Sequence, residues 1–142
     1  MNHGGEGFIP FANGGTLKAE EFSEIIEEMH ENKKYRQMFI MVEVCFGESM
    51  ALDLKTPGVV YFTGAAEKEP SFGCNYDSEI RAWLADDFTC KTLTTISEKP
   101  DLSISDLYTT VYERVAGSHV RLKNYANFGD ISNTFISEFI SP

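Results

Sequence analysis

The sequence is short of basic residues and contains no long apolar run. Only 12 lysines and arginines stand against 22 aspartates and glutamates, which gives a net charge of −10 at pH 7. A nucleic-acid-binding protein would need a basic patch for phosphates, so this balance argues against that class. No apolar run approaches the roughly 20 residues of a membrane-spanning helix. The opening residues, MNHGG, also lack the basic region and apolar core of a secretory signal.

Cysteine is scarce as well, with residues only at Cys45, Cys74 and Cys90. An odd number excludes a complete disulfide framework, and no CxxC spacing indicates a zinc site. We therefore expect Cys74 and Cys90 to be inert, since a buried cysteine usually behaves as a small apolar residue. Cys45 differs from them because it directly follows an apolar run.

The sequence does contain enough apolar material for one α/β domain. Of the 142 residues, 42% are hydrophobic, which suits a globular core. The pattern around Asn13-Gly14-Gly15 predicts a hairpin. Two apolar runs, 38–44 and 59–65, predict parallel strands buried on both faces, and residues 48–54 have room for a short helix between them.

Further elements are predicted from periodicity and capping. Helices are expected at 16–34 and 77–91, and a third begins at the capping box Ser103-x-x-Asp106. Residues 118–125 are a last strand candidate. The buried face of each predicted helix follows from its periodicity, in chain order: Phe22, Ile25, Ile26 and Met29 in the first; Ile80, Trp83 and Leu84 in the second; Ile104, Leu107, Tyr108 and Val111 in the third. Strands that alternate with helices predict an α/β fold with a mostly parallel sheet.

A histidine and a cysteine lie where chemistry is expected in such a fold, at the ends of strands. Cys45 follows the run 38–44, and a helix beginning after it would favour the thiolate. His3 precedes Gly4-Gly5, whose N–H groups can approach a bound carbonyl without obstruction by a side chain. The two residues form a candidate nucleophile and base. The alternatives are a frayed surface histidine and an inert core cysteine.

Glu43 is a carboxylate in an otherwise apolar run, and its burial costs free energy unless it is paired. Because side chains alternate along a strand, Glu43 is predicted to share a face with Cys45. It is either a surface bridge to a lysine or a buried acceptor in a substrate pocket.

Four segments give the chain a resemblance to the legumain family of asparaginyl endopeptidases, which are cysteine peptidases with the caspase-like fold. They are Asn2-His3-Gly4-Gly5, HENKKYRQM at 30–38, Glu43-Val44-Cys45 and Cys74-Asn75-Tyr76-Asp77. The resemblance implies that residues 1–142 form a single, partial peptidase domain. It would be a three-layer α/β sandwich with a mostly parallel sheet whose N-terminal strands are missing. The His-Gly and Glu-x-Cys pair also occurs in GPI-anchor transamidases, whereas the second and fourth segments point more narrowly to legumain.

The resemblance implies an endopeptidase that cleaves after asparagine and, when it is protonated, aspartate. Cys45 would be the nucleophile and His3 the general base and acid, while Gly4 and Cys45 supply backbone donors to the oxyanion. The substrate pocket would include Glu43, Ser71 and Asp86. We expect no cofactor and no metal, and the implied partners are asparagine-containing peptide or protein substrates.

Some residues depart from the family pattern. Asn2 replaces an aspartate, and Pro70 replaces a second pocket serine. The family's strands before the histidine carry an asparagine that orients it and an arginine of the pocket, and this chain lacks both. A missing N-terminal segment would therefore be needed to complete the domain. The resemblance implies an acidic, lysosome- or vacuole-like compartment. The alternatives are an inactive truncated fragment, whose exposed sheet edge invites pairing, and a transamidase-like subunit.

Overall fold

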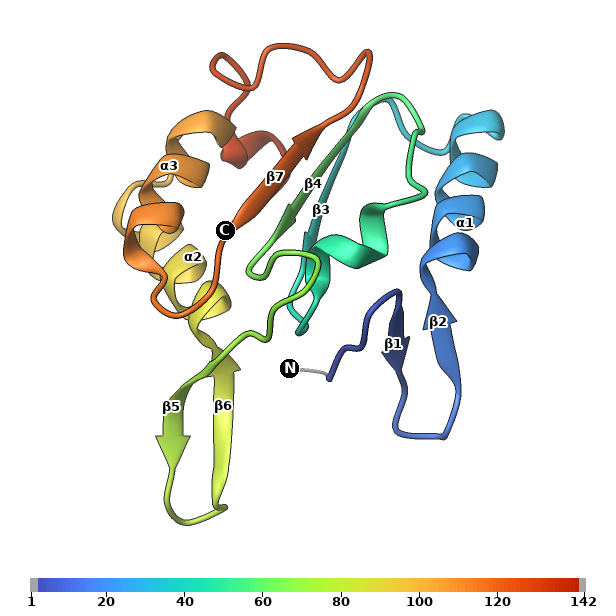
Figure 1. The fold of residues 1–142 in the computed structure, drawn as a ribbon. Helices are drawn as coiled ribbons and strands as arrows, with labels where there is room; N and C mark the ends of the chain where they lie inside the picture. Colours follow the sequence, from blue (N-terminus) through green and yellow to red (C-terminus); the bar gives the residue numbers. More distant parts are fainter. Residues whose placement is uncertain (1–2, 141–142) are drawn as a thin grey trace.

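The centre of the molecule is a three-stranded sheet with the order β3-β4-β7, seen in Figure 1. A computed structural model describes residues 3–140, so that Asn2 lies outside the described residues. β3 (Met38–Val42) is parallel to β4 (Val59–Thr63), which confirms the predicted parallel pair. β7 (Arg121–Asn124) confirms the last predicted strand but runs antiparallel to β4. The sheet is therefore mixed rather than mostly parallel.

β4 is the buried strand of this sheet because it has a neighbour on each side. All five of its residues are buried, as a continuous apolar run predicts for a central strand. β3 pairs with β4 alone among the described strands. Its Met41 is 40% exposed, so that the expected burial of both faces is correct for β4 and wrong for β3.

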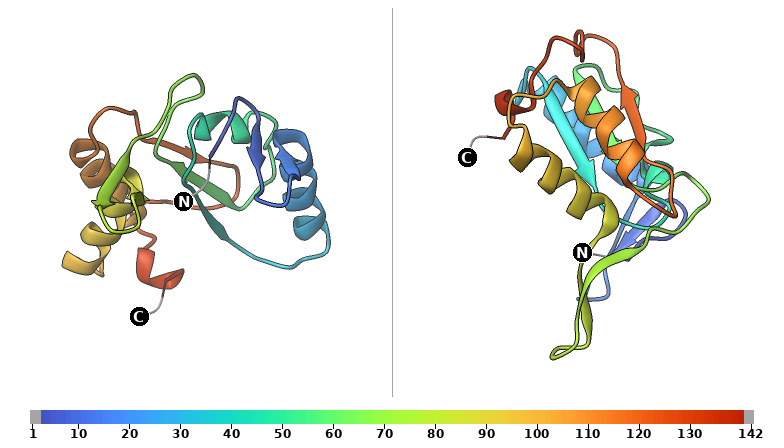
Figure 2. Two further views of the ribbon diagram at one scale, coloured as in Figure 1. Left: turned by 90° about the horizontal axis from the view of Figure 1, so that it is seen from below. Right: turned by 90° about the vertical axis from the view of Figure 1, so that its left-hand side faces the viewer.

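Helices cover both faces of the sheet, as the two views of Figure 2 show. α1 (Ala19–Glu31) and the short 3-10 helix η1 (Gly47–Ala51) lie on one face, where they pack against Val59 and Tyr61. α2 (Asp87–Glu98) and α3 (Ile104–Arg114) lie on the other face, where Phe62 packs against them. The alternation of side chains along β4 thus divides the core into two halves.

The N-terminal hairpin is confirmed, since β1 (Phe8–Pro10) and β2 (Thr16–Lys18) pair in antiparallel register. Because Thr16 belongs to β2, α1 begins later than predicted, and Lys18 is its N-cap. Ile26 is buried on the inner face of α1, whereas Ile25 is largely exposed, contrary to the prediction.

The predicted helix at 77–91 is wrong over most of its length. Its first part is the hairpin of β5 (Gly73–Asp77) and β6 (Ala82–Asp86), which projects from the body of the molecule in Figure 2. Asp86 starts α2, because its Oδ1 accepts a hydrogen bond of 2.8 Å from the N–H of Phe88. The expected buried residues Ile80, Trp83 and Leu84 are all exposed.

The capping box of α3 is confirmed. Ser103 Oγ accepts from the N–H of Asp106 at 3.0 Å and donates to its Oδ2 at 2.8 Å. The inner face of α3 consists of Ile104, Leu107 and Val111, each fully buried. The C-terminal segment contains the 3-10 helix η2 (Ile136–Glu138), whose Ile136 packs beside Phe62. None of the helices within residues 3–140 is long and apolar enough to cross a membrane.

Candidate active site

The carboxyl ends of β3 and β4 bring distant segments of the chain to one edge of the sheet. The N–H of Gly7 donates to Ser49 Oγ at 2.8 Å, which holds the N-terminal segment against η1. The N–H of Glu48 donates to the carbonyl of Ala65 at 3.0 Å, which joins the loops after β3 and β4. This edge is where α/β folds place their ligands.

Gly4 packs directly against the backbone that carries Cys45. A methyl group added at Gly4 would lie 2.2 Å from the carbonyl oxygen of Cys45 and 2.8 Å from Cβ of Val44. Only glycine permits so close an approach. His3 precedes Gly4 and has an exposed side chain. The structure therefore brings together the two segments that the sequence singled out, 42 positions apart.

The thiol of Cys45 is half-buried and faces Ser71. Its Sγ accepts from the N–H of Ser71 at 3.4 Å and lies 3.7 Å from the Ser71 hydroxyl. Among the described residues Cys45 is the free cysteine. Ser71 was predicted to line the substrate pocket only because of the family resemblance. In the structure it is in direct contact with the candidate nucleophile.

Cys45 stands next to a strained turn. Phe46 has φ 60° and ψ 25°, a left-handed conformation that is uncommon for a bulky residue and costs about 1–3 kcal/mol. Two hydrogen bonds hold the turn: the N–H of Phe46 donates to the carbonyl of Glu69 at 2.8 Å, and the Tyr61 hydroxyl donates to the carbonyl of Gly47 at 2.6 Å. The surrounding contacts thus fix the backbone that follows the thiol.

Glu69 and His119 take part in this arrangement, although nothing in the sequence pointed to either residue. The Glu69 carboxylate accepts from the N–H of Ala66 at 2.8 Å and from the N–H of His119, and it pairs with His119 Nδ1 at 2.8 Å. Burial alone would raise the pKa of Glu69, but the hydrogen bonds from His119 and Ala66 outweigh it and lower the pKa. A glutamate in a loop gives no sequence signal of such a role.

Glu43 and Asp86 form an acidic pair on the α2 side of the sheet edge. Burial raises the pKa of the Glu43 carboxyl, and the nearby charge of Asp86 raises it further. Asp86 is only 4% exposed. The structure thus places Glu43 as a partly buried carboxylate beside a second acid, and its role in a substrate pocket stays a prediction.

A cavity of about 210 Å³ adjoins Glu43. It is mostly apolar, and its lining consists of Met41, Glu43, Phe88, Thr89, Thr92 and Leu93. Thr92 Oγ1 is buried there without a hydrogen-bond partner among residues 3–140. Neither His3 nor Cys45 lines this cavity, so that it lies beside Glu43 rather than at the thiol.

The influence of Asp86 on Glu43 can be tested by the substitution Asp86→Asn. Asparagine caps a helix about as well as aspartate, so α2 should persist, while loss of the negative neighbour should lower the pKa of Glu43. The measurement is an NMR titration of the Glu43 carboxyl carbon. Asp86→Ala is the companion variant, expected to lower the pKa equally and also to cost about 0.5–2 kcal/mol of stability through the lost cap. An unchanged pKa in both variants would contradict the pairing.

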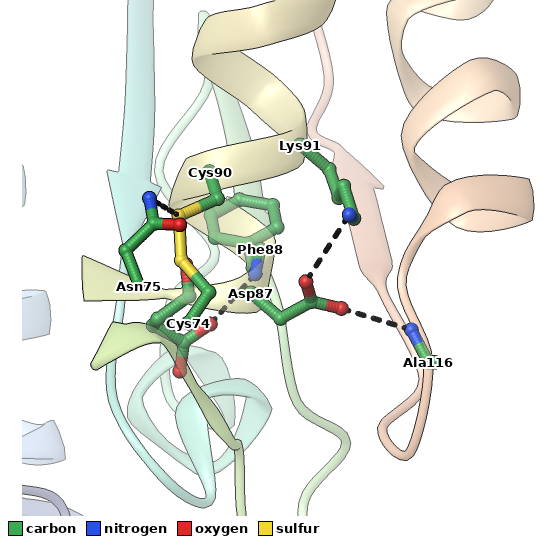
Figure 3. The surroundings of a disulfide bond; sticks show 8 residues. Cys74, Asn75, Asp87, Phe88, Cys90, Lys91 and Ala116 are labelled. Carbon is green, nitrogen blue, oxygen red and sulfur yellow. Dashed lines mark hydrogen bonds and ion pairs between the residues drawn. A yellow bond between two sulfur atoms is a disulfide. The ribbon is translucent and has the colours of Figure 1, made fainter. Parts of the chain in front are cut away.

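Cys74 and Cys90 form a disulfide, drawn in Figure 3, so the expectation of two inert thiols is wrong. Their Cα atoms are 6.8 Å apart. The bond joins β5 to α2 and leaves Cys45 as the unpaired residue of the odd set. The sequence could not give this pairing, because 77–91 was predicted as one continuous helix. Within the described part of the chain, no cluster of three or more His, Cys, Asp and Glu could hold a metal ion.

A thiol beside a histidine-bearing segment, at the carboxyl edge of parallel strands, is the arrangement of α/β proteins with a cysteine nucleophile. Comparison with known families agrees with that class. The chain belongs to the peptidase C13 family, whose family model matches residues 1–141.

Its curated relatives carry two kinds of name. The chain is 33% identical over 140 residues to the vacuolar-processing enzyme delta-isozyme of Arabidopsis thaliana, and 30% identical over 132 residues to legumain of Mus musculus. It is 24% identical over 142 residues to the GPI-anchor transamidase of Saccharomyces cerevisiae. The alignments cover 90%, 92% and 98% of this chain but only 30%, 29% and 34% of the relatives. The chain therefore spans about a third of their length.

Proposed function

We propose that this chain carries the catalytic dyad of a cysteine endopeptidase resembling legumain, which hydrolyses peptide bonds after asparagine. The observation that carries the proposal is the contact of Gly4 with the backbone of Cys45, because it holds the segment that carries His3 against the segment that carries the thiol. Family membership and the 30–33% identity to legumain and the vacuolar-processing enzyme support the same reaction class.

In the proposed mechanism His3 removes the proton from the Cys45 thiol as Sγ attacks the carbonyl carbon of the scissile bond. The N–H groups of Gly4 and Cys45 stabilise the resulting oxyanion. His3 then gives its proton to the departing amine, and a thioester remains on Cys45. Water attacks the thioester with His3 as base, which releases the acid product and restores the thiol.

Specificity for asparagine is assigned to Glu43, Asp86 and Ser71. The amide nitrogen of an asparagine side chain has two donors, which suit the carboxylates of Glu43 and Asp86. Ser71, in contact with the thiol, is available to the substrate at the bond to be cleaved. The charge of Asp86 helps to raise the pKa of Glu43, which supports their placement in one pocket.

Turnover of a fluorogenic peptide with a single asparagine tests the proposal. Removing the nucleophile by Cys45→Ala should lower kcat/KM at least about a thousandfold, since such residues act as a unit with the base. Peptides with glutamine in place of asparagine should not be cleaved. Equal signals from the wild-type chain and Cys45→Ala would contradict a catalytic role for this chain and favour the inactive fragment.

Cleavage after aspartate should depend on pH more steeply than cleavage after asparagine. As pH rises, the substrate carboxyl and Glu43, whose pKa is raised, both ionise and repel each other. Above the substrate pKa of about 4, the protonated fraction falls about tenfold per pH unit. The ratio of kcat/KM for aspartate to that for asparagine should therefore fall between pH 5 and pH 7. A constant ratio would exclude a carboxylate-lined pocket.

We further propose that additional strands complete a caspase-like three-layer sandwich by pairing with β3. Three observations support this: β3 has one partner strand, Met41 is exposed, and Thr92 Oγ1 is buried without a partner among the described residues. The length of the relatives supplies material for such strands. An acidic vacuole-like compartment is proposed from the name of the plant relative.

The second candidate is a subunit resembling GPI-anchor transamidase. It is favoured by the alignment with the yeast transamidase, which covers 98% of this chain. The two candidates differ in the acceptor that resolves the thioester, because water gives hydrolysis whereas an amine gives transamidation. Mass spectrometry of the products, with and without an added primary amine, distinguishes them.

A further inference from the structure

The Cys74–Cys90 disulfide lies at the surface in a polar hollow rather than in the core. Both cysteines are partly exposed, and the hollow has a volume of about 380 Å³. Its lining consists of Cys74, Asn75, Cys90, Lys91, Thr94 and Arg114. Exposed disulfides are the ones that thiols can attack, whereas buried ones resist reduction. The bond is therefore accessible to a small molecule.

Two basic residues, Lys91 and Arg114, line the hollow, each paired with a carboxylate that does not line it. Lys91 Nζ lies 3.6 Å from Asp87 Oδ1, and Arg114 is paired with Glu98 at 2.8 Å. Figure 3 shows Lys91 and Asp87 on the same turn of α2 as the disulfide. A thiol that carries carboxylates would be attracted to these two cations.

The two sulfur atoms have different surroundings. The side-chain amide of Asn75 points to Cys90 Sγ in Figure 3, at a distance of 3.4 Å. Cys90 belongs to the first turn of α2, where the helix dipole favours negative charge. Cys74 Sγ instead lies 3.3 Å from the carbonyl oxygen of Asp86, which disfavours negative charge. The negative charges of Asp86 and Asp87 offset part of the positive potential at this end of α2. Each carboxylate is itself bound, Asp86 by the N–H of Phe88 and Asp87 by the N–H of Ala116 and by Lys91.

We propose that Cys74–Cys90 is an exchangeable disulfide whose reaction partner is a small anionic thiol, and that its redox state controls how firmly Asp86 is held. The incoming thiolate attacks Cys74 Sγ, the bond between the two protein sulfurs breaks, and its electron pair leaves on Cys90 Sγ. A mixed disulfide remains on Cys74. A second molecule of the same thiol attacks it, which gives the oxidised small disulfide and the reduced Cys74, so two electrons pass to the protein.

Asp86 is the residue through which the redox state of the disulfide affects the proposed substrate pocket. It stands between the two cysteines in sequence, at the junction of β6 and α2 that the disulfide spans. With the bond broken, β5 loses its covalent link to α2, and Asp86 loses one of the constraints that hold it. Its effect on substrates rests on the proposed function, whereas the exchange itself does not.

The exchange is tested by mass spectrometry on the 142-residue chain with Cys45→Ala, which removes the third thiol. The disulfide form is treated with reduced glutathione, quenched with acid and mapped by peptides. A glutathionyl group on Cys74 is expected. Cysteamine, a small thiol with a positive charge, should react several-fold more slowly. A glutathionyl group confined to Cys90, equal rates for the two thiols, or no exchange would each overturn the proposal.

Matched variants locate the determinants. Asn75 has φ 54°, so Asn75→Gly keeps the backbone without strain, removes the donor to Cys90 Sγ and should slow the exchange. Lys91→Gln should reduce the preference for glutathione over cysteamine. Lys99→Gln, outside the hollow, should leave both rates unchanged. Wild-type rates in both Asn75→Gly and Lys91→Gln would contradict the proposed recognition.

The link to Asp86 has a readout that needs no enzymatic activity. Reduction of the disulfide should lower the pKa of Glu43, because Asp86 is then free to move away, and an NMR titration of both redox forms measures it. An unchanged pKa would overturn the link even if exchange occurs. Where the wild-type chain cleaves peptides, reduction should raise KM for asparagine substrates several-fold and leave kcat nearly unchanged. Absence of cleavage would contradict only the proposed function.

Discussion

Replacing Gly4 with alanine is expected to lower kcat/KM for an asparagine peptide about a hundredfold while the fold persists. The added methyl group would lie 2.2 Å from the carbonyl oxygen of Cys45 and 2.8 Å from Cβ of Val44. Neither atom is the end of a flexible side chain, so the segment that carries His3 must move away. A displacement of about 1 Å between reacting groups costs on the order of a hundredfold in rate.

Gly15→Ala is the matched control for this substitution. Gly15 lies in the turn between β1 and β2, and a methyl group there would approach Asn13 Oδ1 no closer than 3.2 Å. Its activity should equal that of the wild type. Thermal unfolding of both variants separates loss of alignment from loss of fold. Full activity in Gly4→Ala would show that the contact with Cys45 does not position His3.

Phe62→Ala is expected to remove about 3–5 kcal/mol of stability, a large share of the roughly 5–15 kcal/mol of an ordinary domain. Phe62 is fully buried on β4, where its ring packs against Phe39, Phe88 and Tyr108. Truncation leaves a cavity between the sheet and α2 that rigid neighbours cannot fill. Urea unfolding monitored by circular dichroism gives the free energy of unfolding.

Phe11→Ala serves as the control, because Phe11 is 48% exposed at the N-terminal hairpin. The same chemical change there should cost no more than about 0.5 kcal/mol. Equal losses in the two variants would mean that aromatic packing around β4 does not hold the two layers together.

Local signals predicted the elements that local interactions determine. The apolar run 59–65 predicted β4, and the pair Ser103 and Asp106 predicted the start of α3. The hairpin of β5 and β6 was missed because the spacing of Ile80, Trp83 and Leu84 imitates a helical face. In the structure Trp83 pairs instead with Tyr76 across the hairpin, with ring centroids 5.1 Å apart. Asp86 as a helix cap was the available signal for the true boundary.

The residues of the candidate site also fall into those that the sequence could predict and those that it could not. The closeness of the segments that carry His3 and Cys45 could be predicted from expected strand ends at one edge of a sheet, whereas the catalytic roles of the two side chains stay a prediction. Ser71 and Asp86 came only from resemblance to a family. Glu69 and His119 could not be predicted, since they meet through loops 50 positions apart. The disulfide could not be predicted because it joins α2 to β5, a strand that the sequence did not predict. Such contacts leave no periodicity in the chain.

The antiparallel strand β7 has a consequence for the order of events during synthesis. Thr63 pairs with Arg121, and the loop that holds the turn after Cys45 is fastened through Glu69 to His119. A growing chain that has not yet reached His119 lacks both attachments, because domains are completed only when their distant contacts can form. A nascent chain therefore carries Cys45 well before it holds the neighbours that align it.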